Sequence, residues 1–576
     1  MLTRVLSFTS NKPYRTKHVD DPTPFLDADG HVAFAENDIE NPQNWSVARR
    51  VTISLSAILL ALNAVFASSA PSGCLPSVSL EFGVSSDAAA LVITLFLLGY
   101  CAGPLLFAPL SELYGRRWVF YASFTLYMAM TFLCAFAPNF GSLLVGRFLA
   151  GTLVSAPLSN SPGVLADVWK PRERAESMAL FVTVVWIGPA LGPVTGGFIQ
   201  LTKGDWRWIF YVLLALGGVT WLVMLTIPET HAPTILVQRA RRIRSAKLPG
   251  FETVQAPAEA AQNRSPKAVF VVALTRPWII LFDPISFFCA VYLAVVYMLL
   301  YMLFIIYPIV FQERRGWNPG VGELPLAGTI IGALAGGVIM VLDTRRRSRR
   351  MDRGELRVRH VQPEDNLPLA MYGGIGFAVS IFWFSWSAEY NSVPWIIPTI
   401  AGGFISTFML LIFVTYLNYL VDVYLASAAS AMAANIIARS ACGAAAPLFT
   451  RRMFHALGVG PGGSLIGGLA ALLAVVPFVF RRYGEGIRAR SRFAPASLAE
   501  KQRRRGGLED EEKEEGTRPA EAAVKASSEQ RSDSDGVSNH TDGVVEKNRR
   551  DELINPASST CAGSESKELW SASIAR

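Results

Sequence analysis

Charged and turn-forming residues interrupt one long apolar stretch in the run APLSELYGRR at residues 108–117. Gly115 permits a tight turn between two helices. Glu112 precedes Arg116 by one helical turn, a spacing that suits an ion pair, and Arg117 follows directly. A simple stop-transfer loop needs only positive charge. The combination of an acid, a turn glycine and two arginines therefore indicates a more specific role.

Asp167 is a second candidate for charge chemistry. It lies in VLADVW, at the end of another apolar run. A carboxylate at the C-terminal end of a helix is disfavoured by the helix macrodipole and needs a cationic partner. Arg116 and Arg117 on the adjacent loop are the nearest candidates, and the alternative is a solvated aspartate at the membrane interface.

The run GPALGPVTGG at residues 188–197 concentrates glycine and proline within an apolar stretch. Glycines recur every four residues and share one helix face, and the prolines do the same as sites of kinking. Close helix packing is one interpretation, but the density of both residue types favours a bending or sealing surface. The spaced glycines are Gly188, Gly192 and Gly196, the prolines are Pro189 and Pro193, and Gly197 ends the run.

Two arginines, Arg147 and Arg439, lie inside apolar runs. A charge within a membrane costs about 2.5 kcal/mol or more, so it is expected to face the protein interior and to have a function. Snorkelling to the surface is the alternative for Arg147, which lies near the start of its run. No run holds a histidine or a deep acid. Acidic residues occur near run ends, namely Glu81, Asp87, Glu112, Asp167, Asp283, Glu323, Asp343 and Asp422.

The apolar composition indicates that membrane-spanning helices hold these residues in place. The 576 residues are 51% apolar and 17% charged, which is too apolar for a soluble chain of this length. Twelve runs are long enough to cross a hydrocarbon core as helices. The fold class expected is therefore an all-α membrane protein with twelve transmembrane helices. The runs are 51–70, 88–109, 118–137, 141–166, 177–201, 208–228, 284–311, 324–342, 367–388, 394–421, 426–449 and 461–480.

The charge distribution predicts the orientation. Loops after even-numbered runs hold most of the lysines and arginines, so the positive-inside rule places both termini in the cytosol. The same bias accounts for most of the net charge of +8 without nucleic acid. Six scattered cysteines show neither disulfide nor zinc spacing, so no metal site is expected.

A polar connection divides the runs six and six. We expect a disordered cytosolic N-terminus at 1–50, an N-terminal bundle at 51–228, a cytosolic central loop at 229–283, a C-terminal bundle at 284–483 and a disordered cytosolic tail at 484–576.

A weak internal repeat relates the two halves. LADVW around Asp167 is echoed by LVDVY around Asp422, and a step of 21 residues from each reaches Gly188 and Gly443. Glu112 with Arg116 is likewise echoed by Asp343 with Arg347. Echoes in a common order predict two duplicated, pseudo-symmetric six-helix bundles.

These motifs resemble those of the major facilitator superfamily, and within it the twelve-span drug:proton antiporter family in its fungal multidrug-efflux branch. APLSELYGRR is similar to the family's loop between spans 2 and 3, with Glu112 where aspartate is commoner and Ala108 for its leading glycine. GRFLAG, with Arg147 and Gly151, resembles the span 4 motif, and GPALGPVTGG matches the span 5 motif at each defined position. The resemblance covers residues 39–483.

The resemblance implies the major facilitator fold and alternating access driven by a proton gradient, without another cofactor. Glu112, Gly115, Arg116, Arg117 and Asp167 are then a cytosolic relay. Arg147 and Gly151 belong to proton coupling. Gly188, Gly192, Pro193, Gly196 and Gly197 form the antiporter seal.

Function is predicted as secondary active efflux of small amphipathic organic compounds by a monomer in the plasma membrane, with the vacuolar membrane as the alternative. The partners are the substrate, protons and the lipid bilayer, with no nucleic acid. Polyamine export and a non-transporting sensor are the other candidates. No P-loop and no catalytic triad are present, so an enzyme is not expected. Cavity candidates are Asn63, Asn160, Trp186, Tyr301, Tyr307, Asn418 and Arg439.

The substrate's charge follows from the deep residues. A polyamine is unfavourable inside a membrane cavity unless carboxylates face its charges. Because the runs offer Arg147 and Arg439 at depth and no acid, we expect neutral or weakly acidic substrates. Asp283 or Glu323 would alter this if either reached the cavity.

Overall fold

The computed structural model describes residues 25–27, 29–246, 250–260, 266–353, 363–491 and 493, and this part of the chain is built from helices. The N-terminal half comprises η2 (Pro42–Asn44), α2 (Val47–Ser69), η3 (Ala70–Cys74), α3 (Leu75–Phe82), α4 (Ser86–Ala89), α5 (Leu91–Tyr114), α6 (Arg116–Ala135), α7 (Phe140–Val168), α8 (Pro171–Lys203) and α9 (Arg207–Met224). The connection comprises α10 (Ala232–Ser245), α11 (Pro257–Ala260) and α12 (Pro266–Leu281). The C-terminal half comprises α13 (Pro284–Tyr307), η4 (Pro308–Arg314), η5 (Val321–Leu326), α14 (Ala327–Asp352), η7 (Pro363–Asn366), α15 (Pro368–Glu389), α16 (Ile396–Tyr424), η8 (Leu425–Ser427), α17 (Ala428–Leu457), α18 (Val459–Leu473) and α19 (Val476–Arg490).

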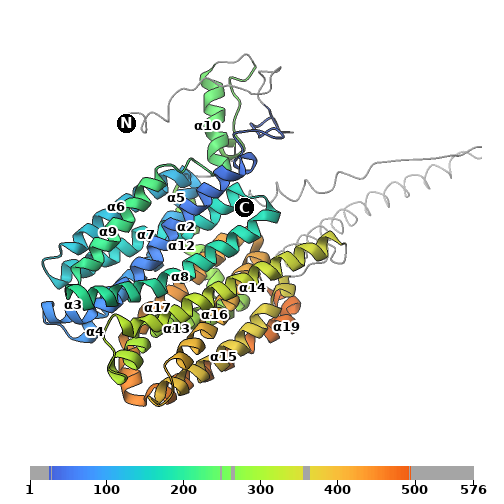
Figure 1. The fold of residues 1–576 in the computed structure, drawn as a ribbon. Helices are drawn as coiled ribbons and strands as arrows, with labels where there is room; N and C mark the ends of the chain where they lie inside the picture. Colours follow the sequence, from blue (N-terminus) through green and yellow to red (C-terminus); the bar gives the residue numbers. More distant parts are fainter. Residues whose placement is uncertain are drawn as a thin grey trace, which may run out of the picture. The chain divides into compact units, whose positions relative to one another are not determined.

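Twelve helical segments of the described chain are long and apolar enough to cross a membrane, which confirms the predicted fold class. The first begins at Val47 and the last continues to Ala489, so both are longer than the apolar runs indicated. Hydropathy marks only the part inside hydrocarbon, whereas helical hydrogen bonding continues into the headgroup layer. Helices α2 and α5–α9 form the N-terminal bundle, and α13–α18 form the C-terminal bundle (Figure 1).

The packing of the two bundles follows the predicted pseudo-symmetry. Helix α5 packs on α7 and α8 packs on α2, just as α14 packs on α16 and α17 packs on α13. Glycines permit the close approach of α5 to α7 and of α14 to α16. A Cβ on Gly151 would collide with the α5 backbone, and one on Gly332 would collide with Gly403 of α16. Between the bundles, α8 lies against α14 and α5 against α17.

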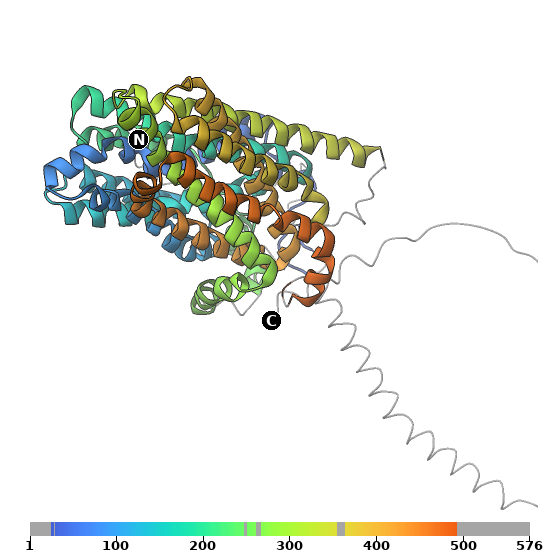
Figure 2. The ribbon, with the colours of Figure 1, turned by 90° about the horizontal axis from the view of Figure 1, so that it is seen from below.

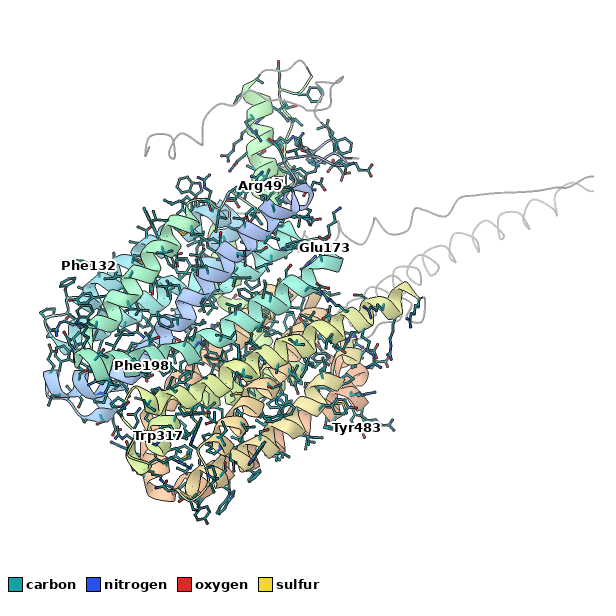
Figure 3. All side chains as sticks on the ribbon, viewed as in Figure 1. Arg49, Phe132, Glu173, Phe198, Trp317 and Tyr483 are labelled. Carbon is teal, nitrogen blue, oxygen red and sulfur yellow. The ribbon has the colours of Figure 1, made fainter. Side chains whose placement is uncertain are left out.

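The two ends of the bundles are marked by labelled side chains (Figure 3). Arg49 and Glu173 lie at one end, and Phe198 and Trp317 lie at the other. We call these the Glu173 end and the Trp317 end. The last turns of α14 project beyond the neighbouring helices at the Glu173 end in both ribbon views (Figures 1 and 2).

The predicted disordered N-terminus and central loop contain ordered structure. The segment 25–46 packs against α10 and the residues that follow it, around a small core of Val32, Ala240, Ile243, Val254 and Ala256. Arginines of α10 form ion pairs that stabilise this module, among them Arg239 with Asp38, Arg242 with Glu40 at 2.8 Å and Arg244 with Glu259 at 2.9 Å. Hydropathy missed the module because its core is too small to stand out in a polar stretch.

An ion pair between Arg244 and Glu259 lies at the edge of this module. The Arg244 guanidinium makes hydrogen bonds to both carboxylate oxygens of Glu259. These bonds lower the pKa of the Glu259 carboxyl from its ordinary value. The pair therefore supports the module at neutral pH.

Other domain boundaries also differ from the expected ones. Helix α12 lies within the expected central loop, yet it packs against α17 and α5. The last span of the C-terminal bundle includes α19, which continues past the expected boundary at 483, and its Arg488 pairs with the buried Glu364 at 3.0 Å. The remainder of the predicted tail, and residues 1–24, lie outside the described residues.

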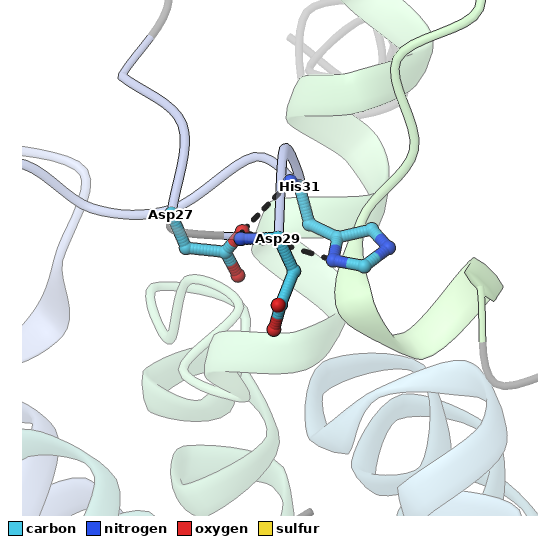
Figure 4. A group of neighbouring side chains, drawn as sticks. All are labelled: Asp27, Asp29 and His31. Carbon is cyan, nitrogen blue, oxygen red and sulfur yellow. Dashed lines mark hydrogen bonds and ion pairs between the residues drawn. The ribbon is translucent and has the colours of Figure 1, made fainter. Parts of the chain in front are cut away.

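Asp27, Asp29 and His31 form a cluster with the spacing of a metal site (Figure 4). One carboxylate oxygen of Asp27 accepts hydrogen bonds from the backbone N–H groups of Asp29 at 3.0 Å and His31 at 2.8 Å. These bonds close a turn in which Gly30 has a φ of 78°. Local turn geometry accounts for the cluster, and we assign no metal to it.

Candidate transport site

The predicted ion pair at the Glu173 end joins α6 to α7. Arg116 Nε lies 2.7 Å from Asp167 Oδ2, and both side chains are largely buried. The guanidinium crosses α7 at Gly163, where a Cβ atom would collide with it. Thr230 donates a further hydrogen bond to Asp167 at 3.4 Å. The carboxylate at the end of α7 thus has the cation that the macrodipole argument requires.

The acid that organises the turn is Glu229 rather than Glu112. Gly115 has a φ of 90° and separates α5 from α6, so Glu112 and Arg116 do not share a helix. Glu112 is exposed. Glu229 accepts hydrogen bonds from the backbone N–H groups of Arg116 at 3.0 Å and Arg117 at 3.2 Å, and so caps the start of α6. Its position just after the sixth span was the only sequence signal for it.

The C-terminal half contains a similar set of charged contacts with one additional residue between the cation and the acid. Asp343 and Arg347 form the predicted pair one helical turn apart, at 2.7 Å. Arg347 also contacts the amide oxygen of Asn366, and the Asn366 amide nitrogen donates to Asp422 at 2.7 Å. An asparagine therefore bridges the cation and the acid that meet directly in the other half.

Arg147 is enclosed in the N-terminal bundle and does not snorkel. It is 1% exposed, and its Nε and one terminal nitrogen donate to the carbonyls of Val92 at 2.9 Å and Ala67 at 3.0 Å. Its guanidinium lies 3.9 Å from the centre of the Phe96 ring. Gly151, one turn further along α7, allows α5 to approach closely enough for these bonds.

The glycines of the 188–197 run lie at two contacts of α8, one within the N-terminal bundle and one with the C-terminal bundle. Cβ atoms on Gly188, Gly192 and Gly196 would collide with α2 and η3, so these three seat α8 within its own bundle. Gly197 faces the other bundle, because a Cβ there would lie 2.5 Å from the Pro319 carbonyl oxygen. The run is thus a packing surface on one side and an inter-bundle contact at its end.

Residues 57–447 match the family model described as Major Facilitator Superfamily. The chain belongs to the major facilitator superfamily. It is 40% identical over 471 residues to efflux pump FUBT of Fusarium oxysporum, covering 80% of this chain and 77% of that one. It is 37% identical over 496 residues to the multidrug transporter mdrA of Aspergillus fumigatus, covering 84% and 80%.

The superfamily fold also appears among solved structures. The proton:xylose symporter XylE of E. coli, bound to 6-bromo-6-deoxy-D-glucose, superposes with a TM-score of 0.55 at 16% identity. The match covers 76% of this chain and 97% of that one. At this identity the likeness concerns the fold alone.

The predicted cavity residues of this superfamily member do not all meet. Asn63 bonds to Tyr127 inside the N-terminal bundle. Asn160 likewise contacts Ser111, and Asn418 is exposed. A polar side chain in a span can satisfy its hydrogen bonds within one bundle, as the first two do, so residue type alone does not place it at a cavity.

Two predicted tyrosines lie in different settings. The Tyr301 hydroxyl lies 2.8 Å from Ser68 Oγ of α2, so this bond crosses between bundles. The Tyr307 ring packs against Phe311 and Phe384 of its own bundle. Only Tyr301 belongs to the central interface by its contacts.

A cluster at the bundle interface brings Trp186 and Arg439 together. The Arg439 guanidinium lies 5.0 Å from the Tyr297 ring centre and 4.9 Å from that of Phe413. The Phe413 ring packs on Trp186 of α8 at 5.1 Å. Asn435, which sequence reasoning missed, lies one helical turn before Arg439 on α17.

Several polar atoms of this cluster are buried and have no hydrogen-bond partner in the described chain. They are Trp186 Nε1, Arg439 Nε and both amide atoms of Asn435. Buried polar groups are nearly always hydrogen-bonded, so several unpaired ones in one place make this cluster a candidate ligand site. We call Trp186, Tyr297, Phe413, Asn435 and Arg439 the Arg439 cluster.

Proposed function

We propose that the protein exports small amphipathic organic compounds by alternating access and uses an inward proton gradient. The relatives named efflux pump and multidrug transporter support export. The matching contacts in the two bundles, with α8 against α14 and α5 against α17, suit a rocking motion about a pseudo-two-fold axis. Closing and opening at either end then exposes the interface to one side at a time.

The Arg439 cluster carries the substrate assignment. It offers hydrogen-bond donors from Trp186, Asn435 and Arg439, one amide acceptor, and aromatic rings on either side. Such a site suits a ring-bearing molecule with a carbonyl, phenol or carboxylate that accepts hydrogen bonds. A cation without a carboxylate beside it favours neutral or weakly acidic ligands over polyamines.

The acids that could have reversed this preference are engaged elsewhere. Asp283 accepts hydrogen bonds from the hydroxyl groups of Tyr424 and Ser491. Glu323 is buried at the Trp317 end. Neither is part of the Arg439 cluster, so spermidine finds no carboxylate there.

The proposed setting is the plasma membrane, with the Glu173 end in the cytosol. The arginine-rich end of α14 and the arginines of α10 support this orientation. Export into the vacuole is the alternative membrane for the same orientation. Imaging of a tagged protein in the native cell distinguishes the two.

The test uses inside-out membrane vesicles with an imposed pH gradient. A weakly acidic aromatic dye, a neutral dye of similar size and spermidine are compared as substrates. We expect uptake of both dyes, little uptake of spermidine, and loss of uptake when a protonophore collapses the gradient. Arg439→Gln should lower acidic-dye uptake, whereas Arg482→Gln, which removes an exposed arginine on α19, should not.

Three outcomes would contradict the proposal. Uptake that persists after the gradient has collapsed would exclude proton coupling. Preference for spermidine would favour the polyamine alternative and would show that a carboxylate outside the Arg439 cluster binds the cation. Normal acidic-dye uptake by Arg439→Gln would remove the cluster from substrate binding.

A further inference from the structure

Glu323 is a carboxylic acid buried at the contact between the two bundles. It lies in η5 at the Trp317 end, and none of its surface is exposed. One oxygen accepts a hydrogen bond from Gln312 Nε2 at 3.0 Å. The other oxygen is buried and has no hydrogen-bond partner in the described chain. A buried polar group without a partner is unusual enough to require an explanation.

The opposite bundle provides part of the cover over Glu323. A Cβ atom on Gly197 of α8 would lie 2.8 Å from Glu323 Cγ. A Cβ on Gly320 would lie 2.9 Å from the Phe198 ring, and Phe198 and Trp317 mark this end in Figure 3. Because α8 belongs to the N-terminal bundle and η5 to the C-terminal half, separating the bundles here would uncover the acid.

The groups around Glu323 supply no compensating cation in the described chain. The Tyr307 phenol lies within electrostatic range. On η4, Glu313 and Arg314 are held in ion pairs with other residues at 2.6 and 2.9 Å. Lys203, at the end of α8, lies 4.7 Å from the centre of a tryptophan ring instead. The first turns of α14 and α16 carry no titratable side chain.

The closed and open arrangements therefore favour different forms of the acid. Burying an ionised carboxylate without a cation is costly, so the closed arrangement favours the neutral form. When the bundles part, water reaches the carboxylate and hydrates its negative charge, so the open arrangement favours the ionised form. Closure and protonation are thus thermodynamically linked.

We propose that Glu323 is a proton-binding site that controls closure of the Trp317 end. A proton from the water at that end binds a carboxylate oxygen before closure, and the same proton returns to that water when the end reopens. The proposal rests on the proposed function only in placing this end outside the cell. There, external acid would favour closure after the substrate has left.

The test measures closure directly, in the full-length purified protein in lipid nanodiscs. Asp87 of α4 and Arg452 of α17 form an ion pair across the bundles at this end, at 2.6 Å. Spin labels on Asp87→Cys and Arg452→Cys, in a chain whose six native cysteines are serine, report the short-distance population. That population is measured from about pH 5 to about pH 8.5, a range in which a buried carboxyl can titrate.

We expect the ratio of closed to open protein to fall with pH, approaching about tenfold per pH unit, the limit for a single proton. Glu323→Gln keeps the shape and the hydrogen bond to Gln312 but cannot ionise, so it should stay closed across the range. Glu323→Asp should retain a pH response. His455→Gln is the matched control, because His455 contacts Glu313 near the labels and should not carry the effect.

A second variant keeps the test decisive if Glu323→Gln does not fold. Gly197→Ala obstructs the approach of η5 to α8, so it should lower the closed population at every pH. A flat response in the wild-type chain, or a wild-type response in Glu323→Gln, would overturn the proposal. Since no gradient or substrate is present, failure here is distinct from failure of proton-driven export in vesicles.

Discussion

Arg147 and Arg439 are both cations within transmembrane helices, but they differ in how far their hydrogen bonds are satisfied by the protein. Arg147 donates to two backbone carbonyls and stacks on Phe96 within the N-terminal bundle. Arg439 lies between two rings at the bundle interface, and its Nε has no partner in the described chain. A cation whose bonds are satisfied locally supports the fold, whereas one with unsatisfied bonds is available to a ligand.

The largest expected effect comes from Arg147→Lys. An ammonium keeps the buried charge but loses the planar guanidinium that reaches two carbonyls and lies over Phe96. We expect destabilisation of about 2–3 kcal/mol, because a buried charge is left poorly compensated. Thermal unfolding of the purified protein measures it against Arg482→Gln. An unchanged melting temperature would show that the carbonyl contacts are dispensable.

Arg439→Gln should lower transport without lowering the stability of the protein, in contrast to Arg147→Lys. Transport of a weakly acidic dye should fall about tenfold, the equivalent of losing one interaction worth about 1.4 kcal/mol. The melting temperature should be unchanged or higher, because the substitution removes a charged group whose buried Nε has no hydrogen-bond partner in the described chain. Vesicle uptake and thermal unfolding on one preparation test both parts. A loss of stability equal to that of Arg147→Lys would make the two arginines equivalent.

Asn435→Leu should have a smaller and selective effect. Neither amide atom of Asn435 has a partner in the described protein, so an apolar side chain of similar size should not destabilise the fold. We expect about a threefold loss for a substrate with a hydrogen-bonding group, and less for an apolar one. Competition between the two dyes measures the ratio. Equal losses for both would indicate a general packing role.

Arg345 is an exposed arginine, in contrast to Arg147 and Arg439, and Arg345→Gln should have the smallest effect. It forms a two-bonded pair with Glu176 across the bundles, at 2.9 and 3.0 Å, at the surface of the Glu173 end. Exposed pairs contribute about 0–1 kcal/mol and are screened by salt. Arg345→Gln should leave the melting temperature almost unchanged. A loss as large as that from Arg147→Lys would mean that this contact holds the bundles together.

The contact between Arg116 and Asp167 was predictable from the sequence, and the cap by Glu229 was not. A carboxylate at a helix end needs a nearby cation, and the adjacent loop offers only Arg116 and Arg117. Glu229 reaches the same turn from more than a hundred residues further along the chain, and only the assembly of α6 against α9 brings it there.

The dependence on tertiary packing also explains why the sequence does not identify the residues of the cavity. Asn63 and Asn435 look alike in the sequence, since each is an asparagine within an apolar run. The first bonds to Tyr127 inside one bundle, and the second has no partner on α17. Their difference depends on the rotation of each helix about its axis, which an apolar run with little amphipathic pattern does not specify.

The sequence alone determined the twelve spans, the division into halves and the superfamily motifs, because the bilayer imposes length and polarity on each segment independently. The tertiary structure decided which polar groups are satisfied. It enclosed Arg147, left buried polar atoms of Trp186, Asn435 and Arg439 without partners in the described chain, and buried Glu323 against Gly197. Burial and pairing are properties of contacts between helices distant in sequence, so they arise only when the two bundles have packed.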